Sequence, residues 1–102
     1  NDRGEIMIRL IDITSKHIED GVGGSWTQCP VALALQNEYK TIDVNVNAEG
    51  NLLVNKKGLL IDYNQQQDVE NFIELFDETY GVEENLCMET VQPFTLRIIE
   101  ER

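Results

Sequence analysis

The stretch "TIDVNVNAEGNLLVNKKGLLIDY", residues 41–63, alternates apolar and polar side chains and is divided by two short turn sequences. Alternation with a period of two predicts β-strands that bury one face. The side chains that we expect to point inward in the first of these strands are Ile42, Val44 and Val46. "AEGN", residues 48–51, predicts a hairpin turn with Gly50 at positive φ, and a tight turn at Lys57-Gly58 leads into the third strand. The simplest interpretation is a three-stranded antiparallel meander.

Two further strands are predicted near the ends of the sequence. "EIMIRLIDI", residues 5–13, is rich in β-branched residues. It is apolar on both faces, which favours a central or well-covered position in the sheet. "FTLRIIEE", residues 94–101, is the last strand, and we expect it beside the first because each terminal strand would otherwise be a weak edge. About five strands therefore form a mainly antiparallel sheet.

Two main helices are expected to pack on one face of this sheet. "CPVALALQNEY", residues 29–39, places Pro30 at the first helical position, and its apolar character over nearly two turns predicts a buried helix. "NQQQDVENFIELFDETYG", residues 64–81, has the clearest helical periodicity and ends at Gly81. Its apolar positions are Val69, Phe72, Ile73 and Phe76. Residues 82–93 are expected to form a loop, and the fold class is α+β.

A short polar segment and a glycine-rich loop connect the first strand to the first main helix. "TSKHIEDG", residues 14–21, predicts a single helical turn that is capped by a hydroxyl side chain and ended by Gly21 in the left-handed conformation. "VGGSWTQ", residues 22–28, lacks the Gly-Lys-Ser/Thr sequence of a phosphate-binding loop. Trp26 in this loop either folds over the core, which we favour, or contacts a partner.

The length and charge of the chain restrict its class and its partners. The 102 residues predict one small domain over residues 7–102, since residues 1–6 have the character of a tag remnant or a disordered N-terminus. The formal net charge of −11 argues against direct binding to nucleic acid or an anionic membrane and favours basic protein partners. No apolar run approaches the roughly 18 residues that span a bilayer. Cys29 and Cys87 fit either a reduced cytosolic protein or one disulfide; we favour free thiols and a cytoplasmic protein.

The acidic residues are concentrated in one part of the sequence. Residues 58–96 contain nine acidic residues and no lysine or arginine. On the second main helix they form a stripe opposite the apolar face, and a row of carboxylates about 6 Å apart can imitate a nucleic-acid backbone and occupy a basic groove. The candidate contact residues are Glu70, Glu74, Asp77 and Glu78, with Glu83 and Glu84 extending the row. The alternative is a solvated face that only keeps the protein soluble.

Cys29 raises the question of an enzyme. It precedes a helix, whose dipole lowers a thiol pKa, and His17 could supply the base of a Cys–His site. We favour instead a buried Cys29 that lies beside Pro30 and packs under Trp26, because no third orienting group accompanies His17. No set of side chains has the spacing of a metal site, and residues 43–51 lack the residue order of a calcium loop. We therefore expect no catalytic residue, no metal and no cofactor.

The order of several motifs resembles a family of small uncharacterised proteins encoded mainly by bacteriophages. The motifs that carry the resemblance are "ITSKHIEDG" (13–21), "CPVALAL" (29–35), "FIELFD" (72–77) and "VQPFTLRI" (91–98). "CPVALAL" is the most specific of them, whereas residues 49–58 and 78–89 look longer than the family pattern. The resemblance implies a phage origin and a host-cytoplasmic setting. It implies no activity and no catalytic residues.

Together these features favour a non-enzymatic acidic protein of phage type. Its acidic helix is expected to bind and modulate or inhibit a basic, nucleic-acid-handling protein of the host or the phage, by DNA mimicry. The alternative is a small structural or accessory module that docks through apolar surface near Trp26, and the third hypothesis is a Cys29-dependent enzyme. Homodimerisation by strand pairing at an exposed edge, residues 41–47, is left open.

Overall fold

The computed structural model describes two continuous segments, residues 6–83 and 86–101. The residues outside the described part are 1–5, 84–85 and 102. Of the N-terminal segment expected to be a tag remnant or disordered, only Ile6 is described, and it begins the first strand.

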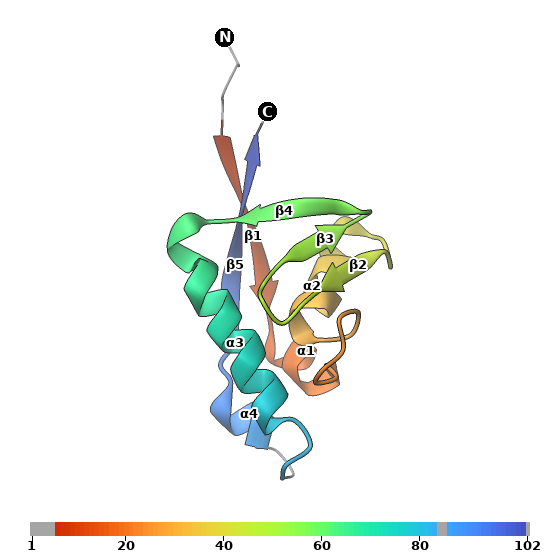
Figure 1. The fold of residues 1–102 in the computed structure, drawn as a ribbon, viewed down its shortest axis with the longest axis vertical. Coiled ribbons are helices and arrows are strands. Elements are labelled where there is room, and N and C mark those ends of the chain that lie inside the picture. Colours follow the sequence, from red (N-terminus) through yellow and green to blue (C-terminus); the bar gives the residue numbers. More distant parts are fainter. Residues whose placement is uncertain (1–5, 84–85, 102) are drawn as a thin grey trace.

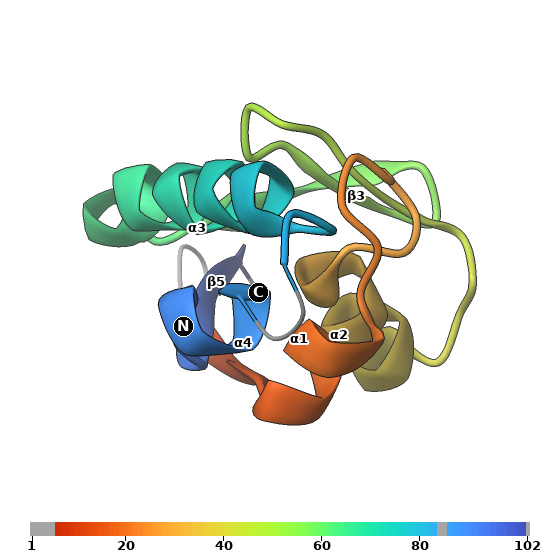
Figure 2. The ribbon, with the colours of Figure 1, turned by 90° about the horizontal axis from the view of Figure 1, so that it is seen from below.

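The fold is α+β, as predicted, and is built on an antiparallel sheet with strand order β1-β5-β4-β3-β2 (Figure 1). The strands are β1 (Ile6–Ile13), β2 (Val44–Val46), β3 (Leu52–Val54), β4 (Lys57–Ile61) and β5 (Phe94–Glu101). The helical elements are α1 (Ser15–Asp20), α2 (Pro30–Tyr39), the 3-10 turn η1 (Tyr63–Gln65), α3 (Gln66–Thr79) and α4 (Leu86–Thr90). Figure 2 shows that α3 lies apart from the α1–α2 pair, so each helical unit covers its own part of the sheet.

One face of the sheet forms the core with the two main helices. Its buried side chains are Ile11, Ile13, Val44, Val46, Leu52, Val54, Ile61, Leu96 and Ile98. The helices contribute Val31, Ala32, Ala34 and Leu35 from α2 and Val69, Phe72, Ile73 and Phe76 from α3. Every apolar position predicted on α3 is therefore buried, and Pro30 begins α2 as expected. The alternate strand positions, among them Leu53 and Leu60, are exposed on the opposite face.

The position predicted for β1 is wrong. β1 pairs with β5 as expected, but it lies at the edge of the sheet, and Leu10 on its outer face is 61% exposed. Arg9 attaches this edge to α2: its guanidinium donates to Glu38 at 2.8 Å and to Glu100 at 2.7 Å and lies over the Tyr39 ring. The apolar pattern predicts that burial of both faces holds β1 in place. The polar contacts of Arg9 with α2 and β5 hold it instead.

The meander β2–β3–β4 is confirmed, with two corrections to its details. Gly50 has the expected positive φ, but Ile42 is 89% exposed because β2 begins only at Val44. The second turn is formed by Asn55 and Lys56, both with positive φ, and not by Lys57-Gly58, which already belong to β4. The hairpin register therefore places the turn two residues earlier than glycine placement suggested.

The segments that connect the strands and main helices differ from the sequence predictions in two further respects. α1 is capped by Thr14 as expected, but Gly21 is extended, with φ of −71°. A Cβ at Gly21 would lie 2.7 Å from the Pro30 ring, so this glycine permits close packing and is not needed for a left-handed turn. The segment expected to be a loop before β5 contains the short helix α4.

Gln65 takes the place of a strand beside β5. β4 pairs with β5 only at Leu60 and Ile61, and the chain then turns away into η1 and α3. The Gln65 side chain, which is 5% exposed, donates to the Thr95 carbonyl at 2.7 Å and accepts from the Arg97 N–H at 2.7 Å. It is the one buried polar side chain among the residues that the structure describes. These two bonds continue the β4 ladder and fix where α3 leaves the sheet.

Candidate functional site

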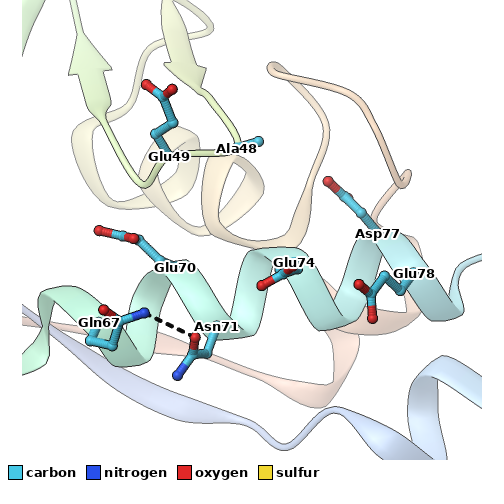
Figure 3. Close-up of a pocket in the computed structure, with 8 residues that line it drawn as sticks. All are labelled: Ala48, Glu49, Gln67, Glu70, Asn71, Glu74, Asp77 and Glu78. Atoms are coloured by element: carbon cyan, nitrogen blue, oxygen red, sulfur yellow. Dashed lines mark hydrogen bonds between the residues drawn. The ribbon is translucent and has the colours of Figure 1, made fainter.

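The acidic residues of α3 lie opposite its buried face and border a groove. The groove has a volume of about 430 Å³ and runs between α3 and the turn that joins β2 to β3 (Figure 3). Its lining residues are Ala48, Glu49, Gln67, Glu70, Asn71, Glu74, Asp77 and Glu78. The structure thus brings together the four predicted carboxylates of α3 and adds a fifth, Glu49, that the sequence pattern did not indicate.

No basic side chain neutralises these carboxylates within the described part of the chain. The ion pairs there join Arg9 to Glu38 and Glu100, Lys16 to Asp20, Lys56 to Asp43 and Arg97 to Asp62. None of these pairs includes a residue of the groove. Five carboxylates from two structural elements therefore face a common space without a compensating charge, which creates a negative potential in it.

The five carboxylates are not equivalent. Asp77 points to the glycine-rich loop, where its carboxylate accepts from the Gly24 N–H at 2.9 Å (Figure 3). Glu70 is half-buried against Gly50 and accepts from the Gln66 amide at 3.2 Å. Glu49, Glu74 and Glu78 are exposed. Asp77 and Glu70 consequently have a structural role, and the other three offer the free contact surface.

The predicted extension of the acidic row is only partly described. Glu83 lies beyond the end of α3 and lines a different cavity, together with Glu19, Tyr80 and Cys87. Glu84 lies outside the described residues. The groove surface is therefore made by α3 and the β2–β3 turn, with no contribution from Glu83.

Trp26 does not fold over the core, which corrects the prediction we favoured. Its side chain is 60% exposed and, with Asn45, Asn47, Asn51 and Leu53, lines a cavity of about 270 Å³. The Val46 N–H donates to the Trp26 carbonyl at 2.7 Å, so the loop lies along β2. This contact partly covers the edge considered for homodimerisation.

The sequence matches no protein-family model, and comparisons with characterised proteins and with solved structures find no significant similarity. The resemblance to phage proteins therefore stays a prediction. No helix in residues 6–83 or 86–101 has the length and apolar character needed to cross a membrane. The same described residues contain no group of three or more His, Cys, Asp or Glu side chains placed to hold a metal ion.

Cys29 is buried at the start of α2, as we expected. Burial raises the pKa of its thiol, and the backbone N–H groups of Val31 and Ala32 oppose this effect without overcoming it. His17 is engaged elsewhere: its Nδ1 accepts from the Thr14 N–H at 3.0 Å and closes a capping box on α1. Burial also lowers the pKa of His17. Among the described residues, no hydrogen bond joins the Cys29 thiol to His17.

Both cysteines are free thiols, in agreement with the prediction, and differ in accessibility. We expect iodoacetamide to label Cys87 of the folded protein at least about tenfold faster than Cys29, because labelling of a buried thiol requires opening of the structure. Mass spectrometry of tryptic peptides would give the two rates, with both thiols labelled in denaturant as the control. Faster labelling of Cys29 would instead indicate an activated nucleophile and support the enzyme hypothesis.

Proposed function

We propose that the protein is a non-enzymatic binding protein of phage type that acts in the host cytoplasm. The surface around its acidic groove binds the basic, nucleic-acid-binding surface of a host or phage protein and thereby modulates or inhibits that protein. The observation that supports this proposal is that Glu49, Glu74 and Glu78 border one groove together with Glu70 and Asp77, and that its lining contains no basic residue. Solvated surfaces usually mix charges of both signs, whereas this groove carries one sign from two elements.

The spacing of the carboxylates suits a competitor of nucleic acid. Glu70, Glu74 and Glu78 follow one another at intervals of four residues, which corresponds to a rise of about 6 Å along the axis of α3 between successive acidic positions. Glu49 adds a charge on the opposite side of the groove. A basic surface that binds a regular row of phosphates would meet a similar row of negative charges. Electrostatic steering would make this association fast and sensitive to salt.

The proposal predicts that reversing the exposed groove charges abolishes binding. We would compare a Glu49→Lys, Glu74→Lys, Glu78→Lys variant with a control variant, Glu19→Lys, Glu83→Lys, Glu89→Lys, that has the same net charge. All six side chains are exposed. We expect the groove variant to lose at least about a hundredfold in affinity for a partner captured from bacterial lysate at about 0.1 M salt, and the control to keep most of it.

Competition then tests the mode of binding. A short DNA duplex should displace the wild-type protein from its partner if both occupy the same basic surface. Retention of the partner by the groove variant, or binding that DNA leaves unchanged, would contradict the proposal.

A further inference from the structure

The glycine-rich loop holds Trp26 in solvent through bonds to three elements. The Trp26 carbonyl accepts from Val46 of β2, the Thr27 carbonyl accepts from the Gln36 amide of α2 at 2.8 Å, and the Gly24 N–H donates to Asp77 of α3. The loop also closes on itself, since the Val22 N–H donates to the Gln28 carbonyl at 2.8 Å. A large, mostly apolar ring that a fixed loop keeps exposed is a preorganised contact surface.

Polar amides face this ring across the cavity. Asn45 and Leu53 are paired in the β2–β3 register and alternate with buried residues, so both lie on the sheet face that points away from the helices. Asn47 and Asn51 are the first and last residues of the β2–β3 turn and complete the wall of the cavity. The cavity therefore combines one indole, one leucine and three asparagines and includes no charged residue.

Most of the hydrogen-bonding capacity of these side chains is unused. The structure shows no intramolecular bond from the Asn45 amide, the Asn51 amide or the Trp26 indole N–H to any described residue. The side-chain oxygen Oδ1 of Asn47 accepts from the backbone N–H groups of Glu49 and Asn51, which leaves the NH₂ group of the same side chain free to donate. Each free amide offers a donor and an acceptor side by side.

We infer that this cavity binds a neutral sugar residue. A pyranose ring presents apolar C–H groups on its face and hydroxyl groups around its rim, so the indole can pack on the face while the asparagine amides pair with neighbouring hydroxyls. The absence of charge in the lining matches a neutral ligand. A volume of about 270 Å³ lies just below the range of roughly 300–1,000 Å³ for drug-sized ligands, which limits the occupant to about one ring.

Two other ligand classes fit the cavity less well. A nucleotide base could stack on the indole and pair with asparagine, but its phosphate would meet a chain of net charge −11 with no basic residue in the cavity wall. A proline-rich peptide needs a series of aromatic side chains along a groove, and Trp26 is the one aromatic residue here.

The test uses the fluorescence of Trp26, which is the chain's single tryptophan. Wild-type protein would be titrated with methyl glycosides of glucose, galactose and mannose and with N-acetylglucosamine. We expect a saturable change in emission with at least one of them. Asn45→Ala and Asn51→Ala should each weaken that sugar about tenfold, because each removes a donor–acceptor pair. Asn64→Ala, an exposed asparagine outside the cavity, should leave the affinity unchanged.

A second readout covers the variant that lacks the fluorophore. In saturation-transfer NMR, Trp26→Ala should lose the sugar signal, while Tyr63→Ala, which removes an aromatic ring that is also exposed, should retain it. Circular dichroism would establish that each variant is folded. The inference is overturned if no glycoside gives a saturable change, if the cavity variants bind like the controls, or if adenosine or a proline-rich peptide binds there in place of sugar.

Discussion

Replacing Gln65 with leucine should lower the free energy of unfolding by about 2–5 kcal/mol. Leucine keeps the bulk of the side chain but offers no hydrogen bond, so the Arg97 N–H and the Thr95 carbonyl would both lose their partner. A fully buried backbone group left unpaired costs about 1–3 kcal/mol, and the two groups affected here are partly buried. The effect should exceed that of most substitutions because the change disturbs the sheet as well as the start of α3.

Urea denaturation followed by far-UV circular dichroism would measure this loss. Gln67→Leu is the matched control, since Gln67 is exposed and its amide reaches only Asn71 on the same helix, at 3.1 Å. We expect the control to change stability by less than about 0.5 kcal/mol. Equal stability of the two variants would mean that the Gln65 bonds contribute nothing to the sheet.

Replacing Phe76 with alanine should cost about 3–5 kcal/mol. Phe76 is 1% exposed on the buried side of α3, and its ring packs against Tyr80 with centroids 5.7 Å apart. Truncation removes most of a large apolar side chain and leaves a cavity that its neighbours fill only in part. The loss should appear as a lower midpoint in urea with little change in slope, because the surface exposed on unfolding stays almost the same.

Leu75→Ala is the internal comparison for this prediction. Leu75 is the preceding residue of α3 but is 38% exposed, so its truncation should cost less than about 1 kcal/mol. A similar loss in both variants would contradict the orientation of α3 and, with it, the outward position of the groove carboxylates.

Much of the fold was predictable because its larger elements have a regular spacing of apolar residues. All four apolar positions of α3 are buried, and Val44 and Val46 of β2 face the core as their alternation indicates. The edge position of β1 was not predictable, since an apolar pattern on both faces indicates burial, whereas the outer face of β1 is exposed. The five residues of α4 are too few for a helical period to be visible.

The turn after β3 shows another limit. Glycine favours left-handed backbone conformations, which predicts a turn at Lys57-Gly58. The strand pairing instead puts Asn55 and Lys56 there, and both adopt positive φ. The strand register depends on the pairing along the whole hairpin, so the presence of Gly58 alone did not predict the position of the turn.

The candidate site was predictable only where one helix supplies it. The interval of four residues placed Glu70, Glu74 and Glu78 on one face of α3, and the structure confirms that placement. Glu49 comes from a distant turn, and no periodicity relates it to α3. The sequence favoured a Trp26 that folds over the core, but the bonds that keep its loop on the surface involve backbone groups that a sequence pattern does not reveal.

The turn between β2 and β3 has a consequence for how the sequence can evolve. Its five residues, 47–51, separate the groove from the Trp26 cavity: Ala48 and Glu49 border one, and Asn47 and Asn51 border the other. Gly50 between them has positive φ, and a Cβ there would lie 2.9 Å from the Glu70 side chain. Each position in this turn is thus constrained by the groove, by the Trp26 cavity or, at Gly50, by the backbone conformation and the neighbouring Glu70 side chain. Relatives of this chain should therefore vary little at these five positions.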